Sequence, residues 1–115
     1  MTTDPLDELR RRALTVRTLY SQVEQRTWGR SWTREELLLG FVTDVGDLAR
    51  IALAREGVRT VGEDPSAALA HELADCLWCV LVLSDAYDVD LPAAFTTSMD
   101  DLEATLRRRV DGPAT

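Results

Sequence analysis

The chain contains no lysine: all 13 of its basic residues are arginine. Any cationic contact that it makes with a phosphate group must therefore use the guanidinium fork of arginine. Acidic residues outnumber basic ones by 20 to 13, and the formal net charge is −7. A surface of this sign argues against binding to duplex nucleic acid, because that binding relies on basic patches.

Cysteine and long apolar runs are also scarce. The two cysteines, Cys76 and Cys79, in a chain without an evident export signal, favour a reducing cytoplasm. The first residues show no basic region followed by an apolar stretch, so we expect no signal peptide. The longest apolar run, Cys76 to Leu83, is far too short to cross a bilayer. We therefore expect a soluble cytoplasmic protein that makes no membrane contact.

Four helices and no convincing strand are predicted, in one all-α domain spanning residues 1–115. Side chains that cap helix N-termini stand before each apolar segment, and Gly57 is a stop signal after the second. These capping residues are Asp4, Thr33, either Asp64 or Ser66, and Asp90. The predicted helices cover roughly 5–25, 34–56, 66–88 and 91–109, and we expect them to form a four-helix bundle.

The second and third predicted helices are apolar around most of their circumference. A helix on the surface of a monomer normally shows a single apolar stripe. A four-helix monomer of this size could not cover both helices, so the economical interpretation is a homo-oligomer with these two helices at its centre. The rival interpretation, a monomer with an exposed apolar face, is less favourable.

Two acidic pairs lie inside these apolar helices. Asp44 and Asp47 form the first pair, and Glu72 and Asp75 form the second. A spacing of three residues places both carboxylates of a pair on one helix face. Four such carboxylates from two helices would make a cage of hard oxygen ligands for Mg²⁺ or Mn²⁺. The alternative is two solvated faces that carry surface acids. Without metal, mutual repulsion should raise the carboxylate pKa values.

Other polar groups near the second pair have plainer interpretations. The spacing Cys76-x-x-Cys79 lies within a predicted helix, where the two thiols are expected to behave as small buried apolar groups. Cys79 is one turn beyond Asp75, so it could line a substrate pocket. His71 is the only histidine. With two cysteines it cannot complete a four-ligand zinc site, and we expect it on the helix surface.

These motifs resemble those of the all-α nucleoside triphosphate pyrophosphohydrolases, the MazG-like and dCTP-pyrophosphatase group. The first pair, within Asp44 to Leu48, is similar to that group's E-x-G-E-L pattern. The second, in residues 71–78 (HELADCLW), is close to its E-L-A-D-V-L-W pattern. Upstream residues also align without gaps to the dCTP-pyrophosphatase branch: Arg26, Thr27, Trp28, Thr33, Leu37 and Leu39. The similarity covers roughly residues 20–105.

The resemblance implies a homodimer or a dimer of dimers that binds Mg²⁺, with Mn²⁺ as a possible substitute, through these four carboxylates. The implied reaction is hydrolysis of an NTP or dNTP to its monophosphate and pyrophosphate. In this group the tryptophan at the position of Trp28 stacks on the base, which implies a substrate-binding role for Trp28. The alternative for Trp28 is that it plugs the end of the bundle. For Trp32 and Trp78 we expect core or interface positions.

The chain departs from the group's pattern at three places. The first pair has Asp44 and Asp47 where glutamates are usual, and Thr43 stands where some members have a further glutamate. In the fourth predicted helix, the usual lysine and asparagine are replaced by Ser98, Asp101 and Leu102. Arg107 to Arg109 could supply the phosphate contacts if that helix returns to the site.

The sequence therefore predicts a Mg²⁺-dependent nucleoside triphosphate pyrophosphohydrolase. A second hypothesis is a catalytically degenerate relative, a helical dimer that binds a nucleotide or a protein partner. A third is a structural bundle with no ligand, for which removal of the four acids should raise stability.

Overall fold

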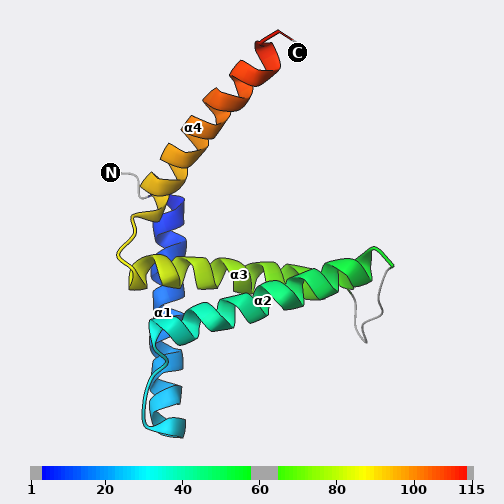
Figure 1. Ribbon diagram of the computed structural model, residues 1–115. Helices are drawn as coiled ribbons and strands as arrows, with labels where there is room; N and C mark the ends of the chain where they lie inside the picture. Colours follow the sequence, from blue (N-terminus) through cyan, green and yellow to red (C-terminus); the bar gives the residue numbers. More distant parts are fainter. Residues whose placement is uncertain (1–3, 58–64, 114–115) are drawn as a thin grey trace.

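The computed structural model describes residues 4–57 and 65–113, and every regular element in these ranges is an α-helix. The helices are α1 (Pro5–Trp28), α2 (Arg34–Arg55), α3 (Pro65–Ala86) and α4 (Leu91–Asp111), as Figure 1 shows. The predicted all-α class and the number of helices are thus confirmed for the described part of the chain.

Helix α1 begins and ends at local signals. The Asp4 carboxylate accepts a hydrogen bond of 2.8 Å from the Leu6 backbone N–H, and Pro5 occupies the first turn, where its missing N–H costs nothing. The helix ends at Gly29, which has a φ of 73°. It is one turn longer than the predicted 5–25, because Gly29 is the first residue suited to the left-handed cap.

Helices α2 and α4 also start at the predicted caps. Thr33 and Glu36 form a capping box, in which each side chain accepts from the other residue's backbone N–H. At α4 the Asp90 carboxylate accepts a hydrogen bond from the Ala93 N–H at 3.2 Å. For α3 the predicted cap Asp64 lies outside the described residues. Helix α3 ends at Ala86, before the predicted residue 88, because the chain turns at Asp88, where φ is 56°.

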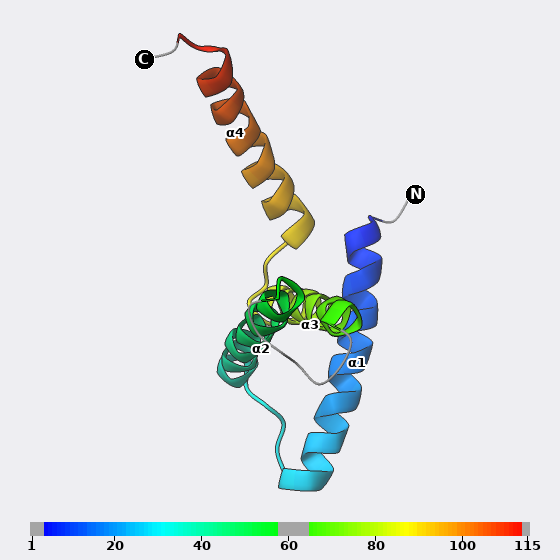
Figure 2. The same cartoon turned by 90° about the vertical axis from the view of Figure 1, so that its right-hand side faces the viewer.

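Helices α2 and α3 run side by side in opposite directions, and α1 crosses them (Figures 1 and 2). The core between α1 and α3 is small: Ala13, Leu81 and Val82 are buried there. Trp78 on α3 ties this core to α1, since its indole N–H donates to the Ala13 carbonyl at 3.2 Å. Its ring also meets Tyr20 edge to face at 5.6 Å between centroids. Trp78, for which a core or interface position was expected, is thus partly buried against this core. Its contacts orient α1 against the hairpin of α2 and α3.

Helix α4 projects away from the other three helices in both views (Figures 1 and 2), and none of its residues is buried. The radius of gyration is 18.4 Å, against about 13 Å for a compact domain of this length. The predicted four-helix bundle is therefore not closed within one chain. Apolar residues of α2 are also open, with Leu39 68% and Val42 64% exposed. The expected oligomer interface on α2 and α3 stays a prediction.

Helix α3 is longer and more apolar than the run Cys76 to Leu83 indicated. By length and composition alone, Ser66–Ala86 could cross a membrane. This is weak evidence, because the core helix of a soluble protein passes the same test. Three carboxylates, Glu72, Asp75 and Asp85, lie along this helix. Helix α3 also packs against both α1 and α2. The expected location in the cytoplasm stays a prediction.

Candidate metal centre

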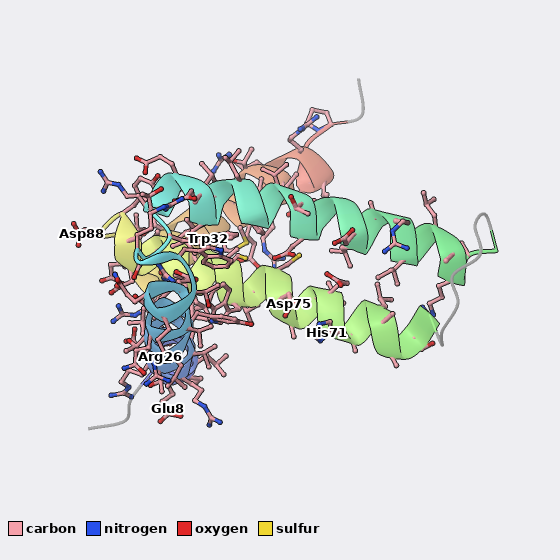
Figure 3. All side chains as sticks on the ribbon, turned by 90° about the horizontal axis from the view of Figure 1, so that it is seen from below. Glu8, Arg26, Trp32, His71, Asp75 and Asp88 are labelled. Atoms are coloured by element: carbon pink, nitrogen blue, oxygen red, sulfur yellow. The ribbon has the colours of Figure 1, made fainter. Side chains whose placement is uncertain are left out.

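The two acidic pairs meet where α2 and α3 lie side by side. One carboxylate oxygen from each of Asp44, Asp47 and Glu72 lies within 4.8 Å of the other two. A second group, within the same limit, consists of His71, Glu72 and Asp75. Glu72 belongs to both groups and so joins the pair on α2 to the rest of the cluster on α3. We call these five residues the acidic cluster; Figure 3 labels Asp75 and His71 within it.

Glu72 is the least satisfied member of the acidic cluster. Its Oε2 atom is buried and has no hydrogen-bond partner among the described residues. The pKa of Glu72 is raised, first because burial disfavours the charged form, and then because Asp75 and Asp47 repel it. A buried anionic oxygen without a partner is costly. A divalent cation would remove that cost, and carboxylate oxygens are the ligands that Mg²⁺ and Mn²⁺ prefer. The residues present therefore fit the metal that the sequence predicts.

Cys79 lies against the α2 side of the cluster. Its thiol donates a hydrogen bond of 3.3 Å to Asp44 Oδ2, and the residue is only 5% exposed. Burial and this hydrogen bond raise the pKa of the Cys79 thiol to about 12. Cys79 therefore supports a carboxylate of the cluster. Its expected place in the lining of a substrate pocket stays a prediction. Burial likewise raises the pKa of Cys76, and both thiols are free.

His71 belongs to the cluster, although the sequence analysis assigned it to the helix surface. Its side chain is 71% exposed, as expected, but its Nε2 lies 3.2 Å from Asp75 Oδ2. The spacing of four residues between His71 and Asp75 puts the two side chains on one face of α3, and that spacing was the available signal. His71 can therefore orient Asp75 or add a nitrogen ligand.

Arg50 is a further residue that the sequence analysis missed. It lies one turn after Asp47 on α2, with 3.9 Å between its guanidinium Nη2 and Asp47 Oδ1. Arg50 also lines a hollow of about 210 Å³ together with His71 and Glu72. Because the chain has no lysine, an arginine beside the carboxylates is the group that could hold a phosphate there.

The structure does not bring Trp28 to the acidic cluster within one chain. Trp28 is the last residue of α1 and is 63% exposed. The C-terminal end of α1 lies well away from the middle of α2 and α3 in both Figures 1 and 2. The tryptophan that lies on the α2 side is Trp32, which lines a hollow of about 270 Å³ with Gly40 and Thr43. Trp32 packs closely over Gly40, where an added Cβ would lie 3.3 Å from its ring.

The arginines of α4 are also remote from the acidic cluster in a single chain. Arg107, Arg108 and Arg109 are exposed, in the part of α4 that is farthest from the hairpin of α2 and α3 (Figures 1 and 2). These arginines could contact phosphates only if the fourth helix returned to the site. Within one chain it does not return.

No protein-family model matches this chain, and no curated protein is significantly similar to it in sequence.

Proposed function

We propose that this protein is a Mg²⁺-dependent nucleoside triphosphate pyrophosphohydrolase, which converts an NTP or dNTP to its monophosphate and pyrophosphate. The observation that carries the proposal is the buried, unpartnered Oε2 of Glu72, beside Asp44 and Asp47. Such an oxygen needs a cation or a proton. The resemblance of both acidic motifs to the MazG-like group supports the same activity.

Asp44, Asp47, Glu72 and Asp75 would hold the metal, with His71 orienting Asp75 through the contact of 3.2 Å. Bound Mg²⁺ would supply Lewis acidity toward the phosphate oxygens and lower the pKa of a bound water. The water oxygen would attack the α-phosphorus, and the bond from that phosphorus to the oxygen bridging to the β-phosphate would break. The water proton would pass to one of the carboxylates or to solvent.

Two further groups would bind the substrate. Arg50 would hold phosphate oxygens in the hollow that it shares with Glu72 and His71. The base would stack on an indole ring, a contact worth ~1–3 kcal/mol in single-strand nucleic-acid binders. Trp28 can fill this role only from a second chain, whereas Trp32 lies on the α2 side of the same chain.

The second candidate is a catalytically degenerate relative that binds a nucleotide or a protein partner without hydrolysis. Two observations favour it over an active enzyme. Asp44 and Asp47 each lack one methylene of the usual glutamates, which shortens their reach by about 1.5 Å. The arginines of α4 also lie away from the cluster in one chain.

The first test is the thermal stability of the protein with and without Mg²⁺ and Mn²⁺. A ligand that binds only the native state at a hundred times its dissociation constant adds ~2.7 kcal/mol. We expect a rise in wild type that Asp75→Asn abolishes. Asp88→Asn is the matched control, because it makes the same change of charge at an exposed position after α3 where asparagine tolerates the positive φ.

The second test is release of pyrophosphate from a panel of nucleoside triphosphates in the presence of Mg²⁺ or Mn²⁺. Turnover that Glu72→Gln abolishes would exclude the degenerate relative. Binding of metal without turnover of any nucleotide would favour that relative instead. Absence of a metal effect in wild type would contradict the pyrophosphohydrolase and favour the catalytically degenerate relative.

A further inference from the structure

His71 and Asp75 form a close pair on one face of α3. Their spacing of four residues brings the side chains together, with 3.2 Å between His71 Nε2 and Asp75 Oδ2. The two side chains are 71% and 43% exposed, and Figure 3 labels them side by side on α3. Because both are open to solvent, an ion can reach both atoms without any unfolding of the helix.

The distance between these two atoms suits binding to one cation. Ligand atoms that lie about 2.1 Å from an ion are about 3.0 Å apart at a right angle and about 3.4 Å apart at a tetrahedral angle. The observed 3.2 Å lies between these values. The two histidines of the His-Glu-x-x-His helix, which bind zinc in metalloproteases, have the same spacing of four residues. His71 and Asp75 could thus hold an ion together with little movement.

Glu72 supplies a third ligand. One ligand atom from each of His71, Glu72 and Asp75 lies within 4.8 Å of the other two. Oε2 of Glu72 is buried and has no hydrogen-bond partner among the described residues. Asp75 directs its Oδ2 toward His71, which leaves its Oδ1 for the cation that Asp44 and Asp47 would hold. The same carboxylates can therefore serve two neighbouring ions.

The imidazole nitrogen determines which metal this group prefers. The group of Asp44, Asp47 and Glu72 offers only oxygen atoms, which Mg²⁺ prefers. Imidazole instead suits zinc and other ions of the first transition series. Neither cysteine belongs to a group of three such ligands among the described residues. The donor set on α3 is thus one nitrogen with carboxylate oxygens, which favours Zn²⁺ over Mg²⁺.

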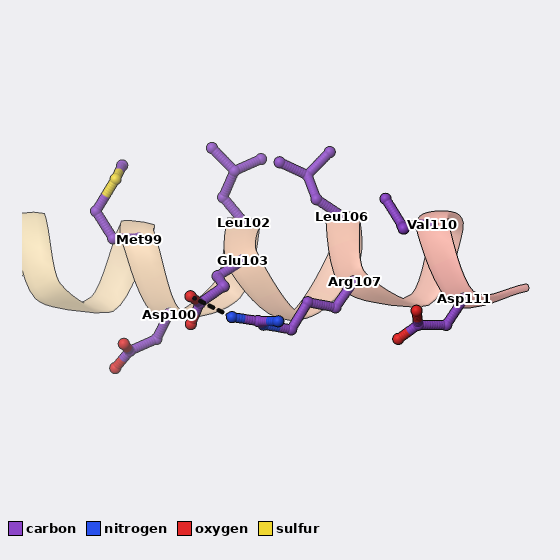
Figure 4. A pocket seen from close by; sticks show the side chains of 8 residues that line it. All are labelled: Met99, Asp100, Leu102, Glu103, Leu106, Arg107, Val110 and Asp111. Carbon is purple, nitrogen blue, oxygen red and sulfur yellow. Dashed lines mark hydrogen bonds and ion pairs between the residues drawn. The ribbon is translucent and has the colours of Figure 1, made fainter.

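The acidic residues of another exposed helix do not form such a group. Figure 4 shows Asp100, Glu103 and Asp111 along α4, where Glu103 forms an ion pair of 3.2 Å with Arg107. None of these residues belongs to a group of three close ligand atoms in the described part of the chain. A histidine and a buried carboxylate oxygen therefore distinguish the group on α3 from ordinary surface acids.

We propose that His71, Glu72 and Asp75 form a second cation site, which takes Zn²⁺ or a related transition-metal ion in preference to Mg²⁺. Three protein ligands leave at least one position on the ion for water or another ligand. His71 and Glu72 also line the hollow of about 210 Å³ that they share with Arg50, so a phosphate oxygen could take that position. The inference rests on the proposed function for Glu72 and Asp75 as metal ligands, but not on hydrolysis of a nucleotide.

The only histidine of the chain gives a direct readout of this site. In untagged, isotope-labelled protein, the signals of imidazole nitrogens in the NMR spectrum all come from His71. We expect Zn²⁺ to move the Nε2 signal and Mg²⁺ to leave it nearly unchanged, because only Zn²⁺ would bind that nitrogen. An Nε2 signal that does not respond to Zn²⁺ would overturn the proposal.

Isothermal titration calorimetry measures how much His71 contributes to the affinity for each metal. Loss of an outer partner of a ligand already costs about tenfold in metal affinity. We therefore expect His71→Ala to weaken Zn²⁺ binding about tenfold or more and to leave Mg²⁺ binding unchanged. This variant should fold, because the His71 side chain is exposed. His71→Asp, which replaces the nitrogen ligand by oxygen, should lower the preference for Zn²⁺ over Mg²⁺.

Three further variants test the other ligands. Asp75→Asn should weaken Zn²⁺ binding as His71→Ala does. Cys76→Ser should leave Zn²⁺ binding unchanged, although zinc binds thiolates, because Cys76 is not part of the site. Asp100→Asn, which removes an exposed carboxylate from α4, is the control and should change neither affinity.

Zn²⁺ binding that His71→Ala leaves unchanged, or that Cys76→Ser abolishes, would overturn the second site. So would Zn²⁺ binding that is lost in His71→Ala but kept in Asp75→Asn, because that result indicates a single surface imidazole. These failures differ from a failure of the proposed function. Nucleotide turnover with Mg²⁺, together with no effect of His71→Ala on Zn²⁺, would support the pyrophosphohydrolase and overturn the second site. The expected Zn²⁺ results without turnover would support the second site and contradict the pyrophosphohydrolase.

Discussion

The thiol of Cys79 on α3 donates a hydrogen bond to Asp44 Oδ2 on α2, with 3.3 Å between sulfur and oxygen. This contact links the apolar interior of the helix pair to the acidic cluster. It holds one oxygen of Asp44 in place from the buried side. Because burial and this bond raise the pKa of the thiol to about 12, Cys79 stays protonated and keeps its role as donor at neutral pH.

Cys79 should therefore be almost inert toward thiol reagents in the folded protein. The thiolate is the reactive form, and an ordinary cysteine has a pKa of about 8.5. We expect labelling with a chromogenic disulfide at pH 8 to be roughly a thousandfold slower for Cys79 than for an exposed cysteine. The unfolded chain should react at both Cys76 and Cys79. The Cys79→Ser variant isolates the contribution of Cys76, and rapid labelling of Cys79 in folded wild type would contradict the buried contact.

Glu72→Gln should have opposite effects with and without metal. The raised pKa of Glu72 means that its charge opposes folding at every pH above the value in the unfolded chain, so removal of the charge should raise the melting temperature in chelator. With saturating Mg²⁺, wild type should instead have the higher melting temperature. Wild type then gains ~2.7 kcal/mol at a hundred times the dissociation constant, which is about 11 °C for this chain length.

Glu35→Gln is the control for this reversal of the melting temperatures, because Glu35 is exposed and lies outside the acidic cluster. Its melting temperature should follow wild type in both conditions. If Glu72→Gln instead lowers the melting temperature in chelator, then Glu72 makes a stabilising contact and the argument for a metal is lost.

Glu24 should be the carboxylate that stabilises the native state most. It is 8% exposed, accepts from Arg17 at 3.2 Å, and accepts from the Trp32 backbone N–H at 2.8 Å. Arg17 also donates to the Trp32 carbonyl at 2.8 Å, so the three groups fix the connection between α1 and α2. Glu24→Ala leaves a half-buried guanidinium and a backbone donor without their acceptor, which should cost about 3 kcal/mol in urea unfolding.

The exposed pair of Arg34 and Glu35 offers a comparison for this result. Its atoms are 3.9 Å apart and both side chains are more than half exposed, so Glu35→Ala should change the free energy of unfolding by less than about 0.5 kcal/mol. Equal effects of Glu24→Ala and Glu35→Ala would show that burial adds nothing to the Glu24 contacts.

Stability should fall in acid partly through Glu36. Hydrogen bonds from Arg30 and from the Thr33 backbone lower the pKa of Glu36 to about 2. A lowered folded-state pKa contributes stability above the unfolded value of about 4.3, and that contribution is lost as the pH falls toward 2. Glu36→Gln should therefore melt lower than wild type at pH 6, and the difference should shrink on acidification.

Thr33→Ala separates the helix cap from the titration of Glu36. It removes the hydroxyl that caps α2 but keeps the backbone N–H that Glu36 accepts. We expect a lower melting temperature at every pH with the acid dependence retained. Parallel melting curves for wild type and Glu36→Gln between pH 6 and pH 2 would contradict the lowered pKa.

The helices were predictable because their signals are local. Each of the side chains Asp4, Thr33 and Asp90 accepts a backbone N–H two or three residues further along, so the information lies within one turn. The end of the first helix was predicted less accurately. Helix α1 passes residue 25 and ends only at Gly29, since Gly29 alone has the backbone freedom of the left-handed cap.

The acidic cluster was predictable only in part. Spacing places Asp44 beside Asp47, and Glu72 beside Asp75, because residues three apart share a helix face. No spacing rule shows that the two faces turn toward each other. The hydrogen bond of Cys79 to Asp44 and the hollow that Arg50 shares with Glu72 join residues more than 20 positions apart in the chain. Such contacts depend on how two helices pack, which short-range patterns do not specify.

By itself, the sequence determined the all-α class, the caps and the order of the helices, because backbone hydrogen bonding within a helix and its capping are short-range. Tertiary structure alone decided which faces meet. Helices α2 and α3 are apolar on most sides, so several packings would bury similar area, and side-chain fit selects the antiparallel pair that gathers the carboxylates. Helix α4 projects away from the other three helices, and none of its residues is buried.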